Sequence, residues 1–319
     1  MITNRDTSAE ALGSARSDKL SFFTSDGGAI DKITSWSAVS PGDFRRALAE
    51  QAAAFPLIPD KDHEKQKHVT LFVHGYNNDW MDAARRYKQI TDDLYAGPAG
   101  LGICVLFTWP SNGQTAHYLA DRDDARASGP DLSTVFNLLY DQAMLMQKKA
   151  ADGTDLCRAK VSVIAHSMGN WVLQNALQYT WERYNKPLLT SLINQCVMVA
   201  ADVDNDLFGS GENIGVGTSE GMANLCYRIT ALYSGKDSVL GMSAGMKHFG
   251  KRRLGRSGLD TASKEPDNVW DFDCSALFKP NEKEIHSAYF WTPKIQQVIK
   301  AVLRGYDRDI VAADHGPGE

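Results

Sequence analysis

The stretch 158–171 reads R-A-K-V-S-V-I-A-H-S-M-G-N-W and decides the fold of this chain. An apolar run at 161–164 is typical of a buried strand. The crowded sequence A-H-S-M-G follows at once, and apolar residues then recur at helical spacing from Trp171 onward. The stretch therefore predicts a strand, a sharp turn and a helix, with Ser167 at the tip of the turn.

Ser167 has the setting of a nucleophile. A serine on such a turn is held out from the sheet edge, with the N–H of the next residue beside it and a helix N-terminus behind it. The turn requires small residues two positions to either side, and Ala165 and Gly169 meet this demand. The alternative interpretation is a helix N-cap serine after a buried strand.

Strands and helices alternate along the rest of the chain. This order predicts an α/β fold with a mostly parallel, doubly wound sheet flanked by helices. We expect a partly ordered N-terminal extension at 1–40, one domain at 41–305 with a candidate lid or pocket wall at 112–130, and a loose tail at 306–319. The predicted strands are 68–73, 102–108, 161–164, 195–200, 226–233 and 269–274, and the predicted helices include 41–55, 79–95, 131–149 and 293–305.

Composition narrows the class of protein. A chain of 319 residues with 43% hydrophobic content can build a full core, which excludes a disordered chain. The net charge is −5 with both signs interspersed, so we expect neither nucleic acid nor an anionic membrane as a partner. Five cysteines without a C-x-x-C pair, no apolar signal-peptide core and no run long enough to span a membrane predict a cytoplasmic protein with buried thiols.

A serine nucleophile needs a histidine base, which in turn needs a carboxylate. His286 follows the last predicted strand in E-I-H-S-A-Y-F-W and is our candidate base, the alternative being a satisfied loop histidine. Two acids compete for the carboxylate, since Asp202 and Asp237 follow successive strands. We prefer Asp237, which occupies the usual place in the order serine, acid, histidine, although it could instead cap a helix. Asp202 would then bond backbone amides near the turn.

Acyl transfer also needs donors for the developing oxyanion. The turn supplies the N–H of Met168, and the loop after His74-Gly75 supplies the N–H of Tyr76. Aromatic residues, which could equally be core, suggest a pocket. The candidate pocket residues are His74, Trp109, Tyr118, His166 and Asp202, with Trp171, Tyr289 and Trp291 as further aromatic candidates.

One stretch competes with this interpretation. Acids alternate at 202–206 as in a calcium loop, but the glycine and glutamate of such a loop are missing, so we predict no metal site and a solvated loop. The basic run 251–253 is expected to be a solvated turn. The chemistry inferred for Ser167 requires no cofactor.

Taken together, these pieces resemble the α/β-hydrolase superfamily and, within it, a bacterial family of hydrolases of unknown function. The resemblance covers about 68–303 and implies a triad of Ser167, Asp237 and His286. The matching pieces are F-V-H-G-Y-N at 72–77, F-T-W-P-S at 107–111, Y-L-A-D-R-D-D-A-R-A-S at 118–128, A-H-S-M-G-N at 165–170, A-A-D-V-D at 200–204, Y-S-G-K-D-S-V-L at 233–240 and H-S-A-Y-F at 286–290.

The expected function is that of a serine carboxylesterase, which cleaves a small-molecule ester through an acyl-enzyme intermediate. An acyltransferase, a thioesterase or an amidase could use the same triad. A non-catalytic binding protein with the same fold is the alternative from another class.

Overall fold

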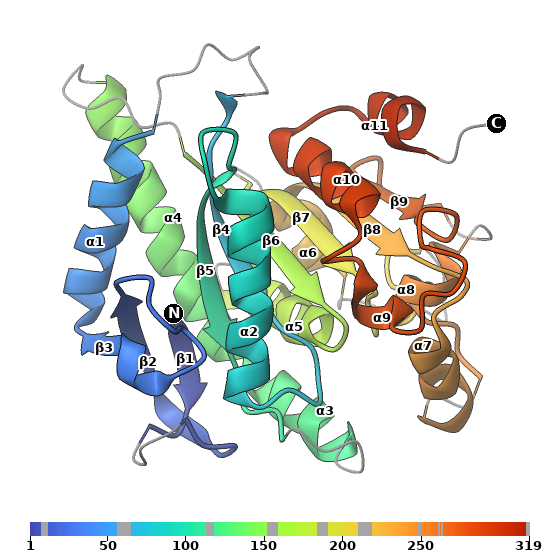
Figure 1. The fold of residues 1–319 in the computed structure, drawn as a ribbon, viewed down its shortest axis with the longest axis horizontal. Coiled ribbons are helices and arrows are strands. Elements are labelled where there is room, and N and C mark those ends of the chain that lie inside the picture. Colours follow the sequence, from blue (N-terminus) through green and yellow to red (C-terminus); the bar gives the residue numbers. More distant parts are fainter. Residues whose placement is uncertain are drawn as a thin grey trace.

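One sheet runs through the molecule (Figure 1). The computed structural model describes residues 1–7, 12–55, 65–112, 118–151, 159–183, 191–209, 219–247, 250–260, 262 and 264–316. Within them the sheet has nine strands in the order β3-β2-β1-β5-β4-β6-β7-β8-β9. The strands are β1 (Ile2–Arg5), β2 (Arg16–Ser25), β3 (Trp36–Val39), β4 (His68–Val73), β5 (Gly102–Thr108), β6 (Lys160–His166), β7 (Ile193–Val199), β8 (Cys226–Tyr233) and β9 (Val269–Asp273).

The neighbouring strands in the order β1-β5-β4-β6-β7-β8-β9 pair in parallel, whereas β2 pairs antiparallel with both β1 and β3. Parallel strands must be joined by crossovers, and the intervening helices supply them. Because both faces of β4 are covered, all six of its residues, H-V-T-L-F-V, are buried. The carboxyl ends of β4, β6 and β8 therefore meet at one edge, which is where ligands bind in such sheets.

Helices cover both faces of the sheet (Figure 1). One apolar core lies under α1, α3, α4, α5 and α6, and the other lies under α2, α7, α9, α10 and α11. No described helix combines the length and apolarity needed to cross a membrane. The helices are α1 (Pro41–Ala53), α2 (Trp80–Ile90), α3 (Tyr118–Ala127), α4 (Gly129–Ala151), α5 (Gly169–Arg183), α6 (Glu220–Leu225), α7 (Ser238–Met242), α8 (Leu254–Ser257), α9 (Ile285–Ala288), α10 (Pro293–Arg304) and α11 (Arg308–His315).

The local signals place these elements well. The strand predictions at 68–73, 102–108 and 226–233 coincide with β4, β5 and β8. The side chain of Ser40 accepts a hydrogen bond from the N–H of Asp43 and caps α1, as its position before Pro41 predicts. Helix 79–95 is split, because α2 ends at Ile90 and a π-helical turn, Thr91–Tyr95, follows.

The two ends of the chain differ from the expectation of an extension and a loose tail. Residues 1–40 contribute three strands to the same sheet, and α11 packs against α10. The sequence I-T-N-R of β1 looks like a polar surface segment, but all four residues are buried. Arg5 is 1% exposed because its guanidinium donates to Thr108 Oγ1 and to the carbonyls of Gly13, Ser111 and Asn78. Burial lowers the pKa of Arg5 to about 10.

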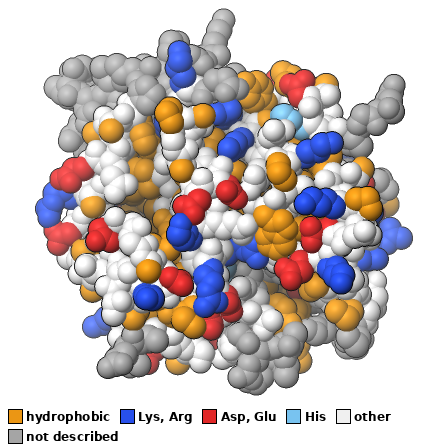
Figure 2. Space-filling model, in the orientation of Figure 1, with side chains coloured by type: hydrophobic (Ala, Val, Ile, Leu, Met, Phe, Trp, Pro, Cys, Tyr) orange, Lys and Arg blue, Asp and Glu red, His pale blue; other side chains and the backbone are white. Residues whose placement is uncertain are grey.

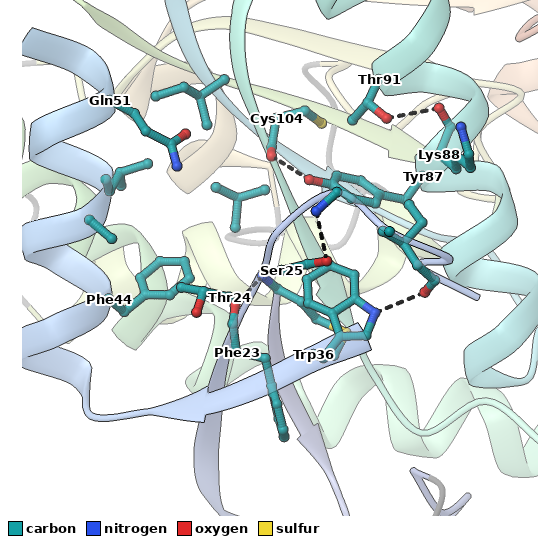
Figure 3. A pocket seen from close by; sticks show the side chains of 18 of the residues that line it. Phe23, Thr24, Ser25, Trp36, Phe44, Gln51, Tyr87, Lys88, Thr91 and Cys104 are labelled. Atoms are coloured by element: carbon teal, nitrogen blue, oxygen red, sulfur yellow. Dashed lines mark hydrogen bonds between the residues drawn. The ribbon is translucent and has the colours of Figure 1, made fainter. Parts of the chain in front are cut away.

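Four of the five cysteines are buried free thiols, at positions 104, 196, 226 and 274. Cys157 lies outside the described residues. A cavity of about 280 Å³ lies beside Cys104, between β2, α1 and α2 (Figure 3). Tyr87 Oη donates to Cys104 O at 2.8 Å there. The predicted site residues do not line this cavity.

A buried histidine on β4 makes stability depend on pH. His68 is fully buried, and burial lowers its pKa to about 3, below the value of about 6.5 in an unfolded chain. As pH falls below about 6.5, His68 binds a proton in the unfolded state but stays neutral in the folded state, so the free energy of unfolding decreases. Between pH 7 and pH 5, His68 should lower the free energy of unfolding by on the order of 2 kcal/mol, and His68→Asn should not show this decrease. Urea unfolding of both proteins at the two pH values measures this, and equal pH dependence would contradict it.

Candidate active site

Ser167 occupies a tight turn between β6 and α5. Its backbone has φ = 53°, in the left-handed region that few residues other than glycine adopt. The surrounding chain imposes this conformation, since the Ser167 N–H donates to Val199 O at 3.0 Å and Ser167 O accepts from the Asp202 N–H at 3.2 Å. Asn170 Nδ2 also donates to Ser167 O, at 3.1 Å. Such strain concentrates at functional turns.

Two glycines let the neighbouring loop approach this turn. A Cβ atom on Gly169 would lie 2.4 Å from His74 O, so only glycine fits there. A Cβ atom on Gly75 would lie 2.8 Å from the Cβ atom of Ser167. The loop after β4 is therefore in direct contact with Ser167.

The two predicted oxyanion donors flank this contact. Tyr76 follows Gly75 in the loop, and Met168 follows Ser167 at the start of α5. The first N–H groups of a helix have no acceptor within the helix, so they can serve a ligand. Both residues keep the role of oxyanion donor as a proposal.

Ser167, His286 and Asp237 lie in one chain of hydrogen bonds. His286 Nε2 is 2.9 Å from Ser167 Oγ, and His286 Nδ1 is 2.7 Å from Asp237 Oδ2. A carboxylate only accepts, so Nδ1 carries the proton and Nε2 accepts from the serine hydroxyl. His286 lies in the short helix α9 rather than in the expected loop.

Asp237 serves two partners with its two oxygens. While Oδ2 faces His286, Oδ1 accepts from the Leu240 N–H at 3.0 Å and caps α7. Arg256 donates to the carbonyl of Asp237, and the side chain of Asp237 is fully buried. The helix cap and the histidine partner, which are alternatives at the level of sequence, are thus combined in one carboxylate.

Asp202 faces other partners. Its Oδ1 accepts from Arg253 Nε at 2.8 Å and from Ser243 Oγ at 3.0 Å, and its Oδ2 accepts from Tyr118 Oη at 2.7 Å. These three partners are side chains, whereas the sequence suggested backbone amides near the turn. The solvated turn expected for 251–253 is wrong for Arg253, which is only 1% exposed. Its burial is stabilised because it also pairs with Asp204.

Ser167 and His286 line a cavity of about 590 Å³. This volume is within the usual size range of ligand pockets. Of the five predicted pocket residues, Trp109 is the one that does not line this cavity. It is fully buried, lies parallel to the His74 ring at 5.3 Å and donates Nε1–H to His74 O at 2.9 Å. The four that line the cavity are His74, Tyr118, His166 and Asp202.

Two further histidines beside Ser167 are kept neutral. Burial and then Arg5 lower the pKa of His74 to about 3. Burial and then His286 hold the pKa of His166 well below its usual range. His166 Nε2 donates to the carbonyl of His286 at 2.8 Å, so it fixes the backbone that carries the candidate base.

The segment 112–130 contributes a wall of the cavity through Tyr118, the first residue of α3. Residues 113–117 of the candidate lid lie outside the described residues. In the described part of the chain, no group of three or more His, Cys, Asp or Glu side chains is placed to hold a metal ion.

Two supporting residues were missed at the level of sequence. Asp121 is fully buried and accepts from Ser111 Oγ at 2.7 Å and from the Asn77 N–H at 3.3 Å, so it joins the loops after β4 and β5. Arg5 binds the same loops from β1. The only sequence signal for Asp121 was its place in the 118–128 resemblance, and Arg5 had none.

The chain is similar to known proteins in sequence and in structure. The protein is similar to the uncharacterized protein alr1448 of Nostoc sp. (strain PCC 7120), with 24% identity over 75% of this chain and 74% of that one. Among solved structures it is similar to Aspergillus fumigatus lipase B, with 12% identity, TM-score 0.42, and coverage of 82% of this chain but only 59% of the lipase. A Pyrobaculum calidifontis esterase gives 9% identity, TM-score 0.35, and coverage of 82% and 93%.

A family model covers most of the chain. The model described as alpha/beta hydrolase of unknown function (DUF900) matches residues 50–268. This match confirms the predicted fold class and the resemblance to α/β hydrolases. The chain therefore belongs to the family of alpha/beta hydrolases of unknown function.

Proposed function

We propose that this protein is a serine hydrolase that cleaves carboxylic esters through an acyl-enzyme intermediate. The observation that carries the proposal is the hydrogen-bonded chain from Ser167 Oγ through His286 to Asp237 at the wall of a large cavity. Nucleophile, base and orienting acid stand within hydrogen-bond reach of each other, which is the requirement for nucleophilic catalysis by serine.

In the first step, Ser167 Oγ attacks the ester carbonyl while His286 Nε2 takes the hydroxyl proton. The N–H groups of Met168 and Tyr76 bind the oxyanion of the tetrahedral intermediate. His286 then returns the proton to the departing alcohol, and the acyl group remains on Ser167. Water, deprotonated by His286, attacks the acyl-enzyme and releases the acid. Throughout, Asp237 stabilises the imidazolium and keeps Nδ1 protonated.

A fluorophosphonate probe tests the proposal directly, because it reacts only with an activated serine. We expect one covalent adduct, located on Ser167 by peptide mass spectrometry, and none in His286→Ala, where the hydroxyl has lost its base. Ser37, an exposed serine on β3, is an internal reference for non-specific reaction. An intact protein without an adduct on Ser167 would instead favour a binding protein with this fold.

A further inference from the structure

Arg86, on α2, lies against the wall of the Ser167 cavity. Its guanidinium carbon is 4.8 Å from the ring centre of Trp291 and 5.4 Å from that of Phe290. The ring of Phe290 in turn lies 5.3 Å from that of His166, the neighbour of Ser167. Cation–π contacts of this kind hold a guanidinium in place without using its N–H donors.

Most of the donors of Arg86 are left for a ligand. A guanidinium has five N–H groups. In the described part of the chain, the only hydrogen-bond acceptor of Arg86 is Gln89 Oε1, at 3.0 Å, and no carboxylate oxygen lies within 4.0 Å of the guanidinium. The two fully buried arginines differ, since Arg253 pairs with two carboxylates and Arg5 donates to four acceptors.

Burial lowers the pKa of Arg86 more than Glu284 and Asp82 raise it, and neither carboxylate is paired with the guanidinium. Asp82 lies on the same helix but is bound by Arg85 at 3.1 Å. Glu284 and Lys283 are both exposed and line the Ser167 cavity, and Glu284 lies more than 4.0 Å from the Arg86 guanidinium. Asp202, deeper in the cavity, is paired with Arg253. Arg86 is half-buried, and burial lowers its pKa, although guanidinium stays charged at neutral pH.

A second hollow of about 630 Å³ continues from this point over α2. It shares Asn77, Asn78 and Arg86 with the Ser167 cavity. The rest of its lining is Asp82, Arg85, Gln89 and Trp291. On the face that carries α2 in Figure 1, positive and negative side chains are closely interspersed (Figure 2). The described residues of this face therefore form no broad positive patch that would attract an anion, and recognition of an anion needs a specific contact. A substrate bound at Ser167 can therefore extend past Arg86.

We propose that Arg86 is a specificity-determining residue, and that the substrate is an ester carrying an anionic oxygen group, carboxylate or phosphate, which the planar guanidinium binds. This inference rests on the proposed function, since it places the anion on the ester that Ser167 attacks. Guanidinium matches both groups with two parallel hydrogen bonds, so it discriminates them from neutral isosteres.

Matched aryl acetates test the inference. Turnover of 4-acetoxybenzoate and 4-acetoxyphenyl phosphate is compared with that of neutral 4-acetoxybenzamide, and mono-4-nitrophenyl glutarate with 4-nitrophenyl pentanoate when the anion is on the acyl side. Arg86→Gln should lower kcat/KM about ten- to hundredfold for the preferred anionic ester, mainly through KM, and change the neutral one less than about threefold. The relative loss for the two anions identifies carboxylate or phosphate as the recognised group.

Two variants control for packing. Arg46→Gln removes an exposed arginine on α1 that is paired with Asp43 and lines neither hollow, so it should leave the anionic preference intact. Arg86→Lys keeps the charge but loses the planar fork, so it should retain part of the preference. Equal losses for anionic and neutral esters in Arg86→Gln, or a wild-type protein without anionic preference, would overturn the inference.

Failure of the proposed function is distinguishable from failure of this inference. If no ester is turned over, calorimetric titration of the intact protein with phenyl phosphate and benzoate still measures the anion site. Binding that Arg86→Gln abolishes and Arg46→Gln preserves would support the anion site alone. No binding of either anion would overturn it.

Discussion

Ser167→Ala should lower kcat/KM for 4-nitrophenyl butyrate by on the order of 10⁵-fold. The substitution removes the atom that forms the acyl-enzyme and leaves the Met168 and Tyr76 N–H groups in place. Some turnover above the rate in water should remain, because the oxyanion donors and the cavity still act on the bound ester. Initial rates over a range of ester concentrations give the ratio.

A double variant makes this test stricter. Ser167 and His286 act as one unit through their 2.9 Å hydrogen bond, so their effects should not add. We expect Ser167→Ala/His286→Ala to lose about as much activity as Ser167→Ala alone. Circular dichroism and thermal unfolding check that the fold persists. If the loss in the double variant were the product of the two single losses, or if Ser167→Ala were fully active, the mechanism would be refuted.

Asp237→Asn should lower kcat by about 10³- to 10⁴-fold while the fold is kept. The amide presents an N–H to His286 Nδ1, so the imidazole takes the opposite tautomer and can no longer accept the proton of Ser167. Asparagine is also a good N-cap, so its Oδ1 can still accept from the Leu240 N–H and hold α7. Steady-state kinetics with thermal unfolding separate the two effects.

Asp202→Asn is the matched control for the competing carboxylate. Asp202 contacts Arg253, Ser243 and Tyr118, so the amide should weaken folding more than catalysis. Leaving the buried Arg253 without this carboxylate should cost about 3 kcal/mol, and kcat should fall less than about tenfold. If Asp202→Asn instead lost as much kcat as Asp237→Asn, the assignment of the acid would be wrong.

Signals that act within a few residues were sufficient for much of the fold. The apolar runs of β4, β5 and β8 and the cap at Ser40 depend on neighbours in the chain, so their bounds could be predicted. Four-residue β1 could not, because its buried polar side chains depend on partners that are mostly distant in the chain, such as Thr108 and Asn78 for Arg5. Buried polar groups require such partners, and a sequence does not display them.

The candidate site divides in the same way. By itself, the sequence determined that Ser167 lies on a strand–turn–helix and that an acid and a histidine follow it at strand ends, because period and turn chemistry are local. Tertiary structure alone decided which acid faces His286, since Asp237 lies 49 residues from it and Asp202 is held by Arg253. The tertiary structure also decided that the guanidinium of Arg86 lies over the ring of Trp291 and keeps N–H donors for a ligand. Pairing between distant side chains depends on how the strands and helices pack, and only the folded chain brings those side chains together.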